Sequence, residues 1–170
     1  MKKTILTFLF ATIILSIAFG QKSADTLFSI TYDPSFHNPS HLTIYKDQEG
    51  SKGLFQTLSM VDGKVTIDTT IALIPDNTYT AYANFFSNYK FPGYIDNKFP
   101  DTTKNYVQGL DGITIIGAYC GDTKKLFRFW SPYHDRASME FFKMTLNDLN
   151  KYFKNKDNKK YLKWLKMYSK

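Results

Sequence analysis

The chain has almost no cysteine. Cys120 is the only one among 170 residues, so no disulfide can form within the chain and stability must come from packing. Two readings of this thiol stay open: a reactive group or intermolecular bridge, and a small residue beside a hairpin turn. Its place next to Gly121 favours the second reading.

The usual signatures of an active site are missing as well. The sequence holds no G-x-S-x-G nucleophile elbow, no H-E-x-x-H zinc motif and no phosphate-binding loop. The S-x-x-K pattern at residues 87–90 lacks its companion motifs. A thiol–imidazole pair of Cys120 and His134 stays open, since residues distant in sequence can meet in space. These absences indicate no cofactor, and they favour a non-enzymatic protein.

Histidine is scarce, with three residues in the whole chain. His37 and His41 have the four-residue spacing that brings two imidazoles together on a helix, but Pro39 lies between them and no glutamate is near. The sequence therefore predicts solvated loop side chains and no metal site.

An excess of basic over acidic side chains is lacking in the main body of the chain. The formal net charge is +7, yet residues 21–150 carry twelve basic and fourteen acidic side chains. Residues 151–170 carry eight lysines against Asp157 alone. One basic terminal segment on an exported chain does not indicate nucleic-acid binding, so we expect no nucleic-acid partner.

What is present at the start is a secretory leader. Lys2 and Lys3 precede an uncharged run over residues 5–19, and small residues at Ala18 and Gly20 mark a cleavage site before Gln21. The run is short for a spanning helix, although an uncleaved anchor is the alternative. No cysteine for lipid attachment lies near the site. The leader predicts an exported protein, periplasmic or secreted, that is soluble after cleavage.

Aromatic residues are abundant, at 17% of the chain. Rings of Tyr and Phe supply large buried areas and specific packing, so a ring-rich core is the expected use. A surface that stacks on a ligand is the alternative.

Short apolar runs between turn residues predict strands at residues 27–32, 42–45, 54–61, 64–68, 113–119 and 125–130. Helical periodicity predicts helices at residues 77–90, 136–154 and 158–167, with Asp76 and Asp135 as N-caps of the first two. This order of strands, helix, hairpin, helix and helix indicates an α+β fold, an antiparallel sheet with helices packed on one face. We expect a signal peptide at residues 1–20, a single α+β domain at 21–156 and a basic C-terminal helix at 157–170.

The hairpin over residues 113–130 carries apolar residues on both of its faces. Alternation places Ile113 and Trp130 on one face and Ile116, Phe127 and Phe129 on the other. Strands that are apolar on both faces are typical of covered positions, so the sequence predicts that this hairpin lies centrally in the sheet.

A resemblance rests on three segments: the turn at residues 109–112, the hairpin that ends in residues 129–132, and the helix that follows. In these the chain resembles small exported bacterial α+β proteins of uncharacterised function. The resemblance covers about residues 27–153 and brings no active site with it.

Three groups of residues are candidates for binding. Rings in the irregular stretch between Pro92 and Pro100 or close to it could stack on a sugar or a peptide: Phe91, Tyr94, Phe99 and Tyr106. The junction before the second helix could hold an anion through Tyr133, His134 and Arg136. The terminal helix combines rings with lysines, among them Lys160, Lys163 and Trp164. Such a helix either lies on an anionic membrane or partner, or docks structurally with its lysines solvated.

Together these features predict a non-enzymatic binding or inhibitor-type module of the cell envelope. The expected partner is a protein or another envelope component, with an anionic membrane surface as a further option through the terminal helix. The alternative is a hydrolase of envelope polymers whose carboxylates cannot be singled out among the acidic residues of the main body.

Overall fold

The computed structural model describes residues 25–88, 112–121, 124–131 and 135–169. The side chains of Val61, Trp130, Ser131 and Asp157 are outside that description. The leader at residues 1–20, the long stretch at residues 91–108 and the predicted packing of the Trp130 ring also lie outside it.

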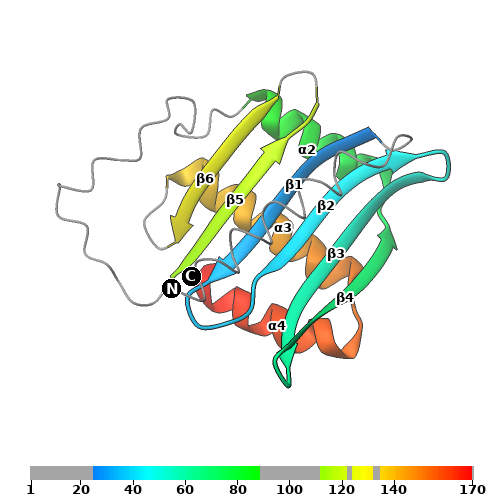
Figure 1. The fold of residues 1–170 in the computed structure, drawn as a ribbon. Helices are drawn as coiled ribbons and strands as arrows, with labels where there is room; N and C mark the ends of the chain where they lie inside the picture. The colour runs from blue at the N-terminus through cyan, green and yellow to red at the C-terminus, as the bar shows by residue number, and fades with distance from the viewer. Residues whose placement is uncertain (1–24, 89–111, 122–123, 132–134, 170) are drawn as a thin grey trace.

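Six strands form one antiparallel sheet in the order β4-β3-β2-β1-β5-β6 (Figure 1). The strands are β1 (Asp25–Pro34), β2 (Ser40–Asp47), β3 (Gly50–Val61), β4 (Lys64–Leu73), β5 (Ile113–Tyr119) and β6 (Lys125–Ser131). The first four strands are a meander, and the β5–β6 hairpin adds to the free side of β1. With its helices the sheet makes the fold α+β, as the sequence predicts.

Three α-helices follow the sequence prediction to within two residues at each end. They are α2 (Asp76–Asn88), α3 (Arg136–Tyr152) and α4 (Lys156–Leu165), and a short 3-10 helix, η1 (Lys166–Ser169), extends α4. Asp135 is the N-cap of α3, since its carboxylate accepts a hydrogen bond from the Ser138 backbone N–H.

The prediction that Asp76 caps α2 is wrong. Asp76 is the first residue of the helix, and the Pro75 carbonyl accepts the first hydrogen bonds, from the N–H groups of Thr78 and Tyr79. The Asp76 carboxylate instead accepts hydrogen bonds from Ser51 Oγ at 2.6 Å and Lys46 Nζ at 3.3 Å. It therefore ties the start of α2 to β2 and β3.

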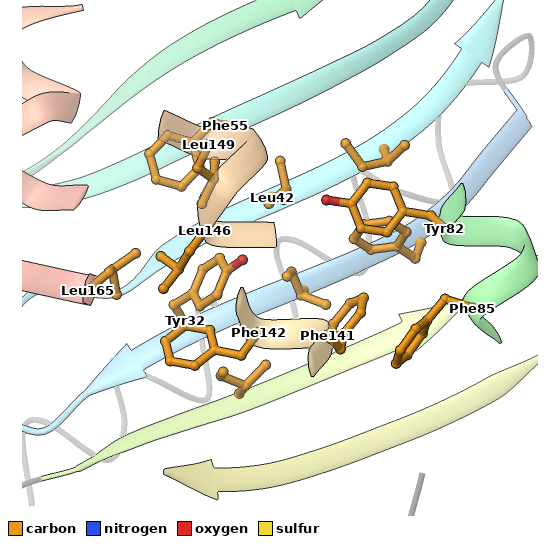
Figure 2. Packing of buried hydrophobic residues seen from close by; sticks show 14 of the residues in the cluster. Tyr32, Leu42, Phe55, Tyr82, Phe85, Phe141, Phe142, Leu146, Leu149 and Leu165 are labelled. Carbon is orange, nitrogen blue, oxygen red and sulfur yellow. The ribbon is translucent and has the colours of Figure 1, made fainter. Parts of the chain in front are cut away.

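The three helices cover one face of the sheet, and rings fill the space between (Figure 1). The Phe28 ring of β1 contacts Tyr82 of α2 at 4.8 Å and Phe141 of α3 at 5.6 Å between centroids. On the other side of the core, Phe55 of β3 contacts Phe153 at 5.7 Å and Tyr161 of α4 at 6.3 Å. Figure 2 shows Tyr32, Phe142 and Leu146 between Phe55 on one side of the core and Phe141 on the other. The ring-rich core that the composition predicts is present.

The β5–β6 hairpin does not occupy the central position that the sequence predicts. In the described part of the chain, β6 is an edge strand and β5 is its only neighbour. The assignment of faces also changes, because Ile116 pairs with Arg128 and points away from the helices, whereas Phe127 and Phe129 are buried with Ile113. The second apolar face of the hairpin is therefore an exposed surface rather than a second core.

Candidate functional surface

The sheet has a second face, directed away from the helices, which we call the outer face. Register assigns its residues: side chains that alternate with the buried Phe28, Leu42 and Phe55 point outward. None of the helices in the described residues lies on this face (Figure 1). A sheet covered on one side is expected to carry polar residues on the other.

The β3–β4 end of the outer face breaks that expectation. We define the β3–β4 patch as its seven aliphatic residues: Leu54, Leu58, Met60, Val65, Ile67, Ile71 and Leu73. Ile71 is 60% exposed and Leu73 is 67% exposed. The same strands are mostly polar on the helix side, where Ser59 and Thr66 share a hydrogen bond and Thr70 accepts from Asn155. At this end of the sheet the apolar side is thus the one without helices.

A neutral polar cluster occupies the middle of the outer face. The His41 ring lies between hydroxyl groups: Ser29 Oγ is 2.8 Å and Thr43 Oγ1 is 3.1 Å from its Nε2, and Thr31 Oγ1 is 3.1 Å from its Nδ1. His41 is only 3% exposed. Burial lowers the pKa of its imidazole to about 4, because charging the ring would require desolvating a cation. His41 is therefore neutral at physiological pH.

Both loop histidines differ from the prediction of solvated side chains. His41 belongs to β2, where its hydroxyl partners satisfy it. His37 stacks flat on the Trp164 ring, with centroids 4.0 Å apart and planes inclined by 3°. In the described part of the chain, no group of three or more His, Cys, Asp or Glu side chains could hold a metal ion.

Two carboxyl groups have raised pKa values, and they lie on opposite faces. Burial raises the pKa of Asp33, which register places on the outer face, and the nearby Arg128 opposes that shift. Burial also raises the pKa of Asp148 on α3, whose carboxylate accepts a 2.7 Å hydrogen bond from Tyr82 Oη. The sheet separates the two, so they do not form a catalytic pair.

The candidate residues from the sequence fall into two sets. Phe91, Tyr94, Phe99, Tyr106, Tyr133 and His134 lie outside the described residues. Arg136 is described, and its exposed guanidinium pairs with Glu140 one helical turn along α3 at 2.9 Å. Its Nε thus donates along the helix rather than into the helix start.

The C-terminal helix is part of the folded body. Leu162 and Leu165 are buried, and Tyr161 Oη donates a 2.8 Å hydrogen bond to the Asn38 carbonyl. Trp164 is half-buried, with His37 on its ring and Lys160 Nζ 5.5 Å from its centroid. Lys163 is exposed beside it. The structure thus joins Trp164, Lys160 and His37 at one surface spot.

Cys120 is half-buried directly after β5. Burial raises the pKa of its thiol, and Lys124 opposes that shift. A raised pKa leaves little thiolate at neutral pH, which disfavours a nucleophilic role.

The apolar outer face was not predicted from the sequence. A signal was present in β4, since residues 65–73 alternate largely between aliphatic and polar side chains. Alternation shows that one face of a strand is apolar, but it does not say whether that face is the core. Comparison with known proteins adds no assignment: no family model, curated protein or solved structure matches the chain. No helix among the described residues is long and apolar enough to cross a membrane.

Proposed function

We propose that this protein is an exported, non-enzymatic binding module of the cell envelope, which holds a protein partner on the outer face of its sheet. Two features support export and binding respectively. The leader at residues 1–20 has the three parts of a cleavable signal. Five residues of the β3–β4 patch are exposed, namely Met60, Val65, Ile67, Ile71 and Leu73, whereas Leu54 is half-buried and Leu58 is buried. Exposed aliphatic patches of this kind mark interaction surfaces.

The single observation that carries the proposal is the direction of the apolar residues in β4. Val65, Ile67, Ile71 and Leu73 all point away from the helices, so they contribute nothing to the core described above. Exposed aliphatic rows reduce solubility and invite aggregation unless a partner covers them. A binding role explains why the apolar residues are on this side.

The chemistry of the face favours a protein partner. Its middle is uncharged, with the hydroxyls of Ser29, Thr31 and Thr43 around a neutral His41. The exposed aliphatic groups of the patch, with the half-buried Ser29 and Thr31 hydroxyls beside them, suit the apolar core and polar rim of a protein interface. The described residues of the β3–β4 patch include no basic side chain, so the patch does not suit an anionic surface.

Site-specific photocrosslinking in the envelope of the producing cell tests this function. A benzophenone side chain at position 71 should give a discrete adduct with a second protein, distinguished by its mass from any adduct of two copies of this chain, while the same group at the exposed helix position 143 should give none. Purified partner should then bind the wild-type protein, and Met60→Lys, on β3 and away from the β4 edge, should weaken that binding at least tenfold. Equal labelling from both positions would contradict the proposal.

A hydrolase is the second candidate, and one observation favours it. Ser29 Oγ lies 2.8 Å from His41 Nε2, within the distance at which an imidazole can take a proton from a serine. The other ring nitrogen meets the Thr31 hydroxyl rather than a carboxylate, so the orienting acid of a triad is replaced by a neutral group. Turnover of cell-wall or peptide substrates by the purified protein, abolished by Ser29→Ala, would establish this candidate over the first.

A further inference from the structure

We propose that two copies of this chain associate through β4, pairing antiparallel about Thr69 to form one continuous sheet. Among the described residues, β4 is the last strand of the sheet and has a neighbour on one side alone. It is ten residues long and largely exposed. A long edge strand of this kind is a template for another strand.

The backbone of β4 directs a regular set of N–H and C=O groups to the open edge of the sheet. The Ile74 N–H donates to the Ser51 carbonyl, and the β3–β4 register runs without a bulge from there to the turn. Even-numbered residues of β4 therefore direct their N–H and C=O groups to β3, and odd-numbered residues direct theirs to the open edge. The odd residues from Val65 to Leu73 are the ones available to a second strand.

The sequence of β4 is nearly symmetric about Thr69. If Thr69 faces its own copy, Ile67 faces Ile71 and Val65 faces Leu73, so aliphatic side chains meet aliphatic side chains throughout the outer face. These are the odd residues, so the same register pairs every edge-directed backbone group. A register shifted by two residues in either direction would place Thr69 opposite Ile67 or Ile71. It would also shorten the paired stretch at one end or bring the β3–β4 turn into the pairing.

The helix side of the strand is complementary in the same register. Asp68 of one copy faces Thr70 of the other, in the closer type of antiparallel pair. Thr70 Oγ1 accepts hydrogen bonds from Asn155 at 2.8 Å and Asn158 at 3.2 Å, which leaves its own proton for the Asp68 carboxylate. The exposed lysines Lys154 and Lys156 flank Asn155, so the incoming carboxylate meets positive charge.

Such a dimer has a twofold axis perpendicular to the sheet, so both helix layers lie on one side. The two β3–β4 patches then join across the axis into a single aliphatic surface on the other side. Pairing thus uses the edge of β4 and leaves the outer face available to the partner proposed above. Failure of either proposal leaves the other standing.

Cysteine mapping of the register, in a Cys120→Ser background, tests the pairing. Opposed Cα atoms in a hydrogen-bonded pair are about 5.5 Å apart, within disulfide reach. Under mild oxidation Thr69→Cys should give covalent dimers. Ile67→Cys alone should not, whereas an equimolar mixture of Ile67→Cys and Ile71→Cys should. Equal dimer yields from Thr69→Cys and from Ile67→Cys alone would overturn the register.

Sedimentation velocity on the exported protein supplies an independent measurement. The wild-type chain should sediment as a dimer, and Thr69→Pro should sediment as a monomer with an unchanged circular dichroism spectrum. Proline removes an N–H that faces the open edge, so the β3–β4 ladder keeps its hydrogen bonds. A wild-type monomer persisting up to about 0.1 mM would overturn the proposal, because a standard interface binds far more tightly.

Discussion

The most unusual single residue is His41, a buried imidazole whose hydrogen-bond partners among the described residues are hydroxyl groups. Its folded pKa of about 4 lies below the ordinary value of 6.5, so protonation favours the unfolded chain. The stabilisation is complete above about pH 6.5 and is lost as the pH falls towards 4. Chemical denaturation at a series of pH values should show a loss of about 3 kcal/mol over that range.

His41→Gln is the matched control for this pH dependence. It removes the titrating group and keeps hydrogen-bonding capacity, so the pH profile should become flatter between 6.5 and 4. Asp33 and Asp148, whose pKa values are raised, shift stability in the opposite direction, and they do so equally in both proteins. Identical profiles for wild type and variant would show that His41 is not the group responsible.

Gly117 of β5 is a core residue with little room for a larger side chain. A Cβ atom there would lie 2.4 Å from Phe127 Cζ and 2.6 Å from Ile30 Cγ2, both in the core. Gly117→Ala should therefore destabilise the protein by about 1–3 kcal/mol through overpacking, measured by thermal or urea unfolding. The adjacent Ala118→Ser, which points outward, should change stability by less than about 0.5 kcal/mol. Equal effects from the two would mean that the core adjusts freely around this strand.

At the scale of elements, α4 is the segment for which the sequence left two readings open. Leu165 is 1% exposed and packs in the core, whereas the neighbouring Lys166 is exposed. Leu165→Ala should cost about 2–5 kcal/mol of unfolding free energy, and Lys166→Ala should be close to neutral. If a thermal melt shows no difference between them, the helix is not docked as described.

The lysines of α4 and of the first position of η1 can be tested separately from the docking of the helix. Replacing Lys160, Lys163 and Lys166 by Gln keeps the buried residues and removes three positive charges. If the helix served an anionic membrane, sedimentation with phosphatidylglycerol vesicles would be strong at low salt and lost in this variant. Because the apolar residues of α4 face the core, we expect neither protein to sediment with the vesicles.

Elements could be predicted from the sequence where local signals decide them. The Asp62-Gly63 pair predicts a hairpin turn, and both residues have positive φ angles, 50° and 74°, as such a turn requires. Asp135 was identifiable as an N-cap because it directly precedes an amphipathic run.

The position of the β5–β6 hairpin was not predictable, because Ile116 is an apolar residue on an exposed face, and in the sequence it cannot be distinguished from a core residue. His41 was missed for a related reason: its three hydroxyl partners come from two strands whose register the sequence does not state.

At the scale of the whole molecule, the proposed export makes a direct prediction about the N-terminus. Cleavage after Gly20 should give a mature chain that begins at Gln21, because small residues stand at the −3 and −1 positions. Intact-mass and N-terminal measurements on protein recovered outside the cytoplasm would show this start. Retention of residues 1–20 would favour a membrane anchor in place of a released protein.

The order of the elements also governs how the chain behaves while the ribosome is still making it. The meander β1–β4 is synthesised first, but the rings on its inner face are covered by helices made later: Phe28 by α2 and α3, and Phe55 by α4. The strand β1 also lacks one of its two neighbours until β5 has been made, because it pairs with both β2 and β5. Contacts between residues far apart in sequence form slowly. The inner face of the meander therefore stays partly uncovered until α3 and α4, in the last third of the chain, have been made.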